Sequence, residues 1–281
     1  MADRNLTTGF RRPRLFTNEG MELIFPPSAV KEVDSIPAKI DPFLTNSATQ
    51  EFPLGTKLVY GDRVFRYVLA GGTSLVAGSL YQSVVPLAGH IDEAIDAPAV
   101  GTSVISFTPA ATTTDDLTAN ELSDGYLWVN DETGEGRVYR IKSHPAITGA
   151  VAGNITLFDP IQIAPAAAAT ASVVHNPWRS IIVVPASTGP TSSLVGVAIH
   201  AVTNAQYGWI QTEGPCAVLT DGTVVIGCQV MPSDGSVAGA VEAWVPETDT
   251  TSEVESMGPI GWVLAVNATT EHSLIWLRGL P

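Results

Sequence analysis

Short runs of alternating apolar and polar residues, bounded by Gly, Pro, Asn and Asp, recur along this chain and predict β-strands throughout. The clearest stretch covers residues 207–231. Within it, residues 207–212, 216–219 and 223–231 form three apolar runs that we interpret as consecutive strands. An Asp-Gly pair between two apolar runs favours a type I′ turn, so Asp221-Gly222 predicts a hairpin between the last two.

The C-terminal third continues this pattern and predicts a β-sandwich or small barrel over residues 171–281. Trp209, Trp244, Trp262 and Trp276 are expected to anchor its core or its subunit contacts. The predicted strands after residue 180 are 180–184, 194–202, 207–212, 216–219, 223–231, 237–245, 261–266 and 273–277.

Residues 55–170 predict a first β domain with less regular spacing. Residues 90–96 are the best short helix candidate, and the alanine-rich stretch 164–170 is either a short helix or a linker at the domain boundary. The predicted strands are 57–60, 63–69, 103–108, 126–130, 136–142 and 154–158.

Residues 1–54 predict an extended N-terminal arm, because six prolines interrupt them and no period of 2 or 3.6 is sustained. The arm carries many large apolar residues, so we expect it to be ordered by packing on its own domain, a neighbouring subunit or another protein. The alternative is a floppy terminus. We expect residues 1–50 to be removable with the body still folded. The fold class is therefore all-β, with two β regions after an arm.

Composition supports a folded β protein, since 45% of the 281 residues are hydrophobic and 15% are charged. The net charge of −14 argues against non-specific nucleic-acid binding. Arg4, Arg11, Arg12 and Arg14 make the first fourteen residues locally basic, and we favour protein contact over nucleic acid for them. A secretory signal and a membrane-length apolar run are both lacking, which predicts a soluble protein made in a cytoplasm.

Candidate chemistry is sparse. The five histidines show no metal-ligand spacing, and His200 is expected in the core or an interface. The acidic turn 131–135 lacks the spacing of a Ca²⁺ loop. Phosphate-cradle, dinucleotide and nucleophile-elbow motifs are absent from the sequence, so we predict no enzyme, cofactor or metal.

The two cysteines are expected to be buried thiols rather than a disulfide. In the predicted hairpin Cys216 lies opposite Gly227, so Cys228 points to the other face; a bulge in the register would allow a bridge.

Several segments resemble the capsid decoration, or cement, proteins of tailed bacteriophages. They are GTKLVYGDRVFRYVLAGG (55–72), DGYLWVNDETGEGRVYRIKSH (124–144), AQYGWIQTEGPCAVLTDG (205–222) and the SLIWLRGLP ending. The resemblance implies a non-enzymatic virion protein on the capsid surface, assembled in the host cytoplasm. It also implies a homotrimer that clamps neighbouring major capsid subunits, with no nucleic acid or membrane partner. The chain is longer than the smallest members, which leaves a head fibre or tail component open.

The residues expected to contact the capsid lie in the arm. A β-module that binds a host glycan or receptor is the alternative function, and a polysaccharide depolymerase with two carboxylates is a third. The predicted contact residues are Phe10, Arg11, Arg12, Arg14, Leu15, Phe16, Leu23, Ile24 and Phe25.

Overall fold

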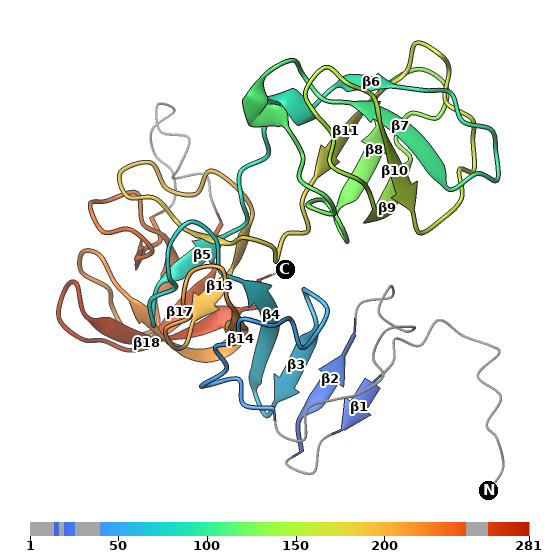
Figure 1. Ribbon diagram of the computed structural model, residues 1–281. Helices are drawn as coiled ribbons and strands as arrows, with labels where there is room; N and C mark the ends of the chain where they lie inside the picture. The colour runs from blue at the N-terminus through green and yellow to red at the C-terminus, as the bar shows by residue number, and fades with distance from the viewer. Residues whose placement is uncertain (1–13, 17–19, 26–39, 246–257, 281) are drawn as a thin grey trace, which may run out of the picture.

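The computed structural model describes residues 14–16, 20–25, 40–245 and 258–280, and over them the chain is all-β, as predicted. It forms one large sheet and one closed barrel, which stand side by side in Figure 1. The described helical elements are two 3₁₀ turns, η2 (Ala88–His90) and η3 (Thr113–Asp115).

The large sheet contains twelve strands, nine of them in the order β1-β2-β3-β4-β14-β18-β17-β15-β16, while β5, β12 and β13 pair beside that path. The strands are β1 (Arg14–Phe16), β2 (Glu22–Ile24), β3 (Lys57–Tyr60), β4 (Arg63–Leu69), β5 (Leu80–Gln82), β12 (Ile182–Val183), β13 (Leu194–Ala198), β14 (Tyr207–Leu219), β15 (Gln229–Pro232), β16 (Val241–Ala243), β17 (Gly261–Ala265) and β18 (His272–Arg278).

The barrel closes in the order β10-β7-β6-β11-β8-β9 and has its own apolar interior. Phe107, Leu127, Ile141 and Ile155 fill that interior and are fully buried. The strands are β6 (Glu93–Ile95), β7 (Val104–Thr108), β8 (Tyr126–Val129), β9 (Val138–Ser143), β10 (Gly153–Leu157) and β11 (Thr170–Val174).

The strand pairing divides the chain differently from the predicted domains 55–170 and 171–281. Strands β3 to β5 precede the barrel, yet they belong to the large sheet together with β12 to β18. The connection is the pairing of β4 with β14, in which Tyr67 lies opposite Trp209. Pairing between segments so distant in sequence leaves no local pattern from which it could be predicted. Of the predicted domain boundaries, the one at residues 170/171 lies near the end of the barrel, because the last barrel strand β11 ends at Val174.

Residues 207–231 are arranged differently from the prediction, because residues 207–219 form one strand, β14. It runs unbroken for 13 residues, with a bulge between Gln211 and Glu213 and with Gly214 at φ +85°, so the Gly-Pro pair does not end it. The predicted hairpin is wrong, because β14 pairs with β4, β13 and β18 whereas β15 pairs with β16 and β17. Gly222 is left-handed (φ +71°) but Asp221 is not, so a type I′ turn does not form.

The helix predicted at 90–96 is also wrong. Only the first residue of that stretch lies in η2, and Glu93–Ile95 form strand β6 between β7 and β11. Residues 164–169 form no helix and lead into β11. In both places pairing within the barrel prevails over local helix propensity.

The described part of the predicted arm belongs to the core of the large sheet. Leu23 is fully buried in β2, opposite Leu58 of β3, and Met21 and Phe25 are 5% exposed. Phe52 packs against the rings of Tyr67 and Trp209, at centroid distances of 5.3 and 5.5 Å. Removing residues 1–50 would strip Met21, Leu23 and Phe25 from the core, so the packing does not support the expectation that the body survives that deletion.

Candidate functional site

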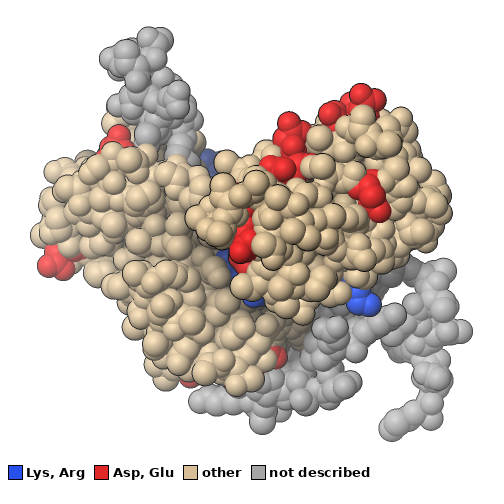
Figure 2. Space-filling view, turned by 45° about the horizontal axis from the view of Figure 1, so that its top comes forward, with Lys and Arg blue, Asp and Glu red and all other residues tan. Residues whose placement is uncertain are grey.

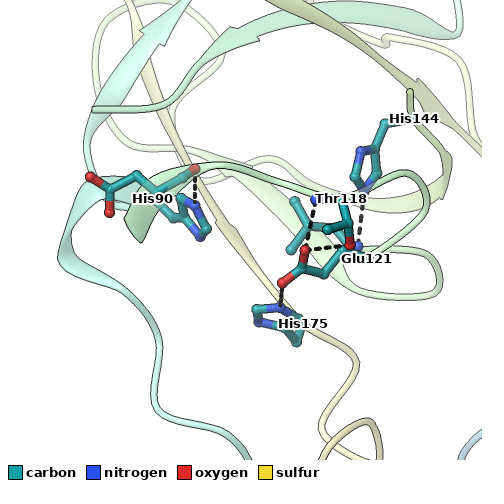
Figure 3. A network of polar contacts seen from close by, with 7 residues as sticks. His90, Thr118, Glu121, His144 and His175 are labelled. Atoms are coloured by element: carbon teal, nitrogen blue, oxygen red, sulfur yellow. Dashed lines mark hydrogen bonds and ion pairs between the residues drawn. The ribbon is translucent and has the colours of Figure 1, made fainter. Parts of the chain in front are cut away.

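A network of polar contacts lies where the chain enters and leaves the barrel, and Glu121 is at its centre (Figure 3). Glu121 Oε2 accepts hydrogen bonds from the backbone N–H and the hydroxyl of Thr118, both at 2.8 Å. Its Oε1 lies 3.2 Å from Nε2 of His175, which follows β11. Both carboxylate oxygens are therefore engaged. The Thr-x-x-Glu spacing of residues 118–121, a capping-box pattern, was the sequence signal for this contact.

The hydrogen bonds set the charge of Glu121. The bond from His175, with those from Thr118, lowers the pKa of the Glu121 carboxyl to about 2, against the opposing effect of partial burial. The carboxylate is therefore ionised across the physiological pH range, and it forms an ion pair whenever His175 is protonated.

His144 is held as a neutral imidazole on the other side of the network. The backbone N–H of Leu122 donates to its Nε2 at 2.9 Å, so the proton resides on Nδ1, which donates to the carbonyl of Pro145 at 2.7 Å. Burial lowers the pKa of His144, which agrees with this neutral form.

The geometry of the network suits structure rather than nucleophilic catalysis. A catalytic triad needs a hydroxyl bonded to an imidazole that a carboxylate orients. Here the Thr118 hydroxyl donates to the carboxylate itself, and the His144 ring is bonded on both nitrogens to backbone. The network therefore fastens the segment after β11 to the barrel.

The same segment is anchored to the large sheet a few residues later. The Asn176 amide oxygen accepts from the backbone N–H of Trp178 at 2.9 Å, and the indole of Trp178 lies in the core under the guanidinium of Arg66. The contacts of His175 and Trp178 thus hold the connection between barrel and sheet at both ends.

Replacing Glu121 by Gln tests this fastening. The folded pKa of about 2 lies below the ordinary value of 4.5, so the carboxylate's contribution to stability is complete above about pH 4.5 and is lost as the pH falls towards 2. We expect Glu121→Gln to lower the free energy of unfolding at pH 7 by about 1–2 kcal/mol, reduced by water because the side chain is 28% exposed. Between pH 4.5 and 2 the variant should lose less stability than the parent.

Urea unfolding followed by circular dichroism at several pH values measures both effects. Glu135→Gln is the control, since Glu135 is exposed in a barrel turn and undergoes the same chemical change. Equal pH profiles for Glu121→Gln and the parent would contradict the role of the network.

An apolar surface covers the outward face of the adjacent strands β17 and β18. Trp262 of β17 lies opposite Trp276 of β18, and their indole planes are parallel within 6° at a centroid distance of 6.2 Å. Trp262, Leu264 and Leu274 are 37%, 38% and 40% exposed, and Trp276 is half-buried. Trp244 lies in the same cross-strand row, because its backbone N–H donates to the carbonyl of Gln229, which pairs with Trp262. We call these five side chains (Trp244, Trp262, Leu264, Leu274 and Trp276) the tryptophan face.

A charged pair on β14 and β18 stands at one end of this face. Glu213 and Arg278 pair across the strands at one end, and Leu219 pairs with His272 at the other. Between those ends the outward side chains of β14 and β18 are uncharged: Pro215, Ala217, Leu274 and Trp276. Of the four tryptophans predicted as core or contact anchors, Trp209 lies in the core and the other three lie on this face.

The two cysteines are free thiols with different surroundings. Burial raises the pKa of the Cys216 thiol to about 12, which excludes it as a nucleophile near neutral pH. Cys228 is exposed, so the prediction of two buried thiols is wrong for it. His200 is half-buried and its Nε2 lies 2.7 Å from the Thr45 carbonyl oxygen.

The acidic turn at residues 131–135 contributes a hydrogen bond to the start of strand β11. Asp131 Oδ1 accepts a 2.8 Å hydrogen bond from the backbone N–H of Thr170 at the start of β11. Figure 2 shows acidic side chains gathered over the barrel on the right, while the large sheet on the left presents a mostly uncharged surface. Among the residues that the structure describes, no group of three or more His, Cys, Asp and Glu is arranged to hold a metal ion.

The predicted capsid-contact residues fall into three groups. Phe10, Arg11 and Arg12 lie outside the described residues, and Arg14, Leu15 and Phe16 form the edge strand β1. Leu23 and Phe25 are buried in the chain's own core, and Ile24 is half-buried between them. The structure thus assigns Leu23 and Phe25 to the core rather than to a contact surface.

Comparison with known proteins gives no relative. No family model matches the chain, no curated protein matches it, and no solved structure matches its fold. Within the described parts of the chain, no helix has the length and apolar character needed to cross a membrane.

Proposed function

We propose that this chain is a structural virion protein that decorates the outer surface of a tailed-phage capsid and stabilises contacts between major capsid subunits. The supporting observation is the contrast between its polar and apolar features. The polar cluster around Glu121 and His144 is engaged in structural hydrogen bonds, whereas the tryptophan face is presented to solvent. Exposed apolar surface of this kind is typical of proteins that work by binding.

The N-terminal end supplies the second element of the proposal. Residues 1–13 contain three arginines and one aspartate, a formal charge of +2 in a chain of charge −14. They directly precede β1, which lies at one end of the sheet order. A basic segment that precedes an edge strand in the sequence suits contact with an acidic surface or strand edge of a capsid subunit.

Deleting residues 1–13 tests the proposal and keeps every described strand, because the deletion stops before β1. We expect the truncated chain to keep its circular dichroism spectrum and to bind capsids roughly tenfold or more weakly, measured by co-sedimentation. The capsids are assembled from the major capsid protein of the same genome and lack this chain.

Substituting Ala for Arg4, Arg11 and Arg12 in the full-length chain separates charge from length. If charge carries the contact, this triple variant loses as much binding as the truncation, and added salt weakens the parent in the same way. Undiminished capsid binding by the truncated chain would contradict the proposed role of the segment.

A further inference from the structure

We propose that the guanidinium of Arg63 is a binding site for a single carboxylate group, carried by a small organic acid or by an acidic side chain of another protein. Arg63 is the first residue of β4 and lies beside the bulge of β14 between Gln211 and Glu213. The site is made by contacts within this chain alone, so its test needs no capsid and is independent of the proposed function.

A fully buried glutamine holds the guanidinium in place. The Oε1 atom of Gln211 accepts hydrogen bonds from Nε and Nη2 of Arg63, at 2.8 and 2.6 Å. The Nε2 atom of Gln211 donates to the carbonyls of Glu213 and Pro215, both at 2.9 Å, which turns its oxygen towards Arg63. Gln211 has no exposed surface. A buried side chain with its polar atoms engaged in this way preorganises the cation that it contacts.

Two phenyl rings support the same guanidinium. The Cζ atom of Arg63 lies 4.8 Å from the ring centroid of Phe43 and 5.1 Å from that of Phe65, which are cation–π contacts. Tyr60 pairs with Arg63 across the turn between β3 and β4, is 43% exposed, and meets Phe43 edge to face. Glutamine and aromatic rings orient the positive charge but do not neutralise it.

The charge of Arg63 has no negative partner. Among the described residues Arg63 forms no ion pair, although the chain contains 28 acidic residues. Burial lowers the pKa of Arg63, the direction expected for a cation that has lost water without gaining an anion. A bound carboxylate would compensate for that lost hydration.

One edge of the guanidinium is open to receive the carboxylate. The contacts with Gln211 use Nε and one N–H of Nη2. Within the described part of the chain, Nη1 makes no hydrogen bond and is not a buried atom, so it reaches water. The remaining N–H groups of Nη1 and Nη2 form a planar fork, which matches the two oxygens of one carboxylate.

The surrounding charge favours a carboxylate over a phosphate. Asp62 directly precedes Arg63, and Glu213 pairs with Val64; both acidic side chains are exposed. Together with the net charge of −14, they repel a phosphate group, which carries more than one negative charge near neutral pH, more strongly than a carboxylate.

The test follows the Nε–Hε signal of Arg63 in ¹H–¹⁵N NMR spectra of the full-length chain. Sodium acetate is added while sodium chloride keeps the ionic strength constant. We expect a saturable shift of this signal and of the backbone N–H signals of residues 60–64, with a dissociation constant of about 1–50 mM. Arg63→Lys keeps the charge but removes the fork, so it should assign the Nε–Hε signal and weaken the response of residues 60–64 at least ~10-fold.

Arg137→Lys is the matched control. Arg137 also donates to a glutamine, Gln162 Oε1 at 3.0 Å, but it is exposed in the barrel. This variant should leave the acetate titration of Arg63 unchanged. Unchanged circular dichroism shows that each variant folds, and the parent's Nε–Hε signal decides the question even if Arg63→Lys does not fold.

A blocked tripeptide with one glutamate distinguishes the two sources of the carboxylate. Binding at least ~10-fold tighter than acetate assigns a protein side chain, and a smaller difference assigns a small acid. Three results would overturn the proposal: a shift that does not saturate or that chloride reproduces, an Arg63→Lys variant that titrates like the parent, or tighter binding of inorganic phosphate than of acetate.

Discussion

Replacing Trp209 by Ala should lower the free energy of unfolding of the large sheet by about 3–5 kcal/mol, the largest effect that we expect from a single substitution. Trp209 is fully buried in β14, and its ring lies 5.1 Å from Tyr67 and 5.5 Å from Phe52. The substitution leaves a cavity in the core of the large sheet, where β14 packs against Phe52 of the segment before β3. Chemical denaturation followed by near-ultraviolet circular dichroism, which reports on packed aromatic rings, measures the loss.

Trp209→Phe is the matched control. It keeps an aromatic ring against Tyr67 and Phe52 and removes the indole N–H, which is buried and has no hydrogen-bond partner among the described residues. Because an unpaired buried donor costs free energy, its removal offsets part of the lost packing. Trp209→Phe should therefore cost much less than Trp209→Ala, and equal losses would contradict the packing described here.

Replacing Leu23 by Ala should lower the free energy of unfolding of the isolated chain by about 2–5 kcal/mol. Leu23 has no exposed surface and lies in β2 between Leu15 of β1 and Leu58 of β3. The large effect follows because residues near the N-terminus complete the core of a sheet whose other strands come much later in the chain.

Ile24→Ala provides the comparison within the same strand. Ile24 is half-buried and lies next to Leu23, on the opposite face of the strand, so its truncation should cost roughly 1 kcal/mol or less. If both substitutions left the isolated chain equally stable, residues 20–25 would be a contact segment for a partner and not part of the core.

The sequence predicts the all-β class and many strands because alternation is a local signal. Strands β3 and β4 begin and end where the pattern around Gly61-Asp62 places them. Residues 90–96 show the limit of local reasoning. Their propensity favours a helix, but residues 93–95 form β6, which pairs with both β7 and β11 and so closes the barrel. The Asp221-Gly222 signal failed for the same reason, since β14 already has β4 and β18 as neighbours.

The candidate site, too, could be predicted only in part from the sequence. The Thr118–Glu121 spacing was visible in the sequence, but its contact with His175, 54 residues later, depends on closure of the barrel. The tryptophans could be counted from the sequence, whereas their separation into the buried Trp209 and the outward Trp262 depends on which face of the sheet each strand presents. A residue's side of a sheet follows from pairing with neighbours that the sequence does not name.

The account rests on the claim that this chain acts by attaching to a larger protein shell. Co-sedimentation of the purified full-length chain with capsids that lack it measures this most directly. The account predicts saturable binding, with capsids that resist heat or chemical disruption better once occupied. A chain that stays in the supernatant at every concentration, and leaves capsid stability unchanged, would contradict it.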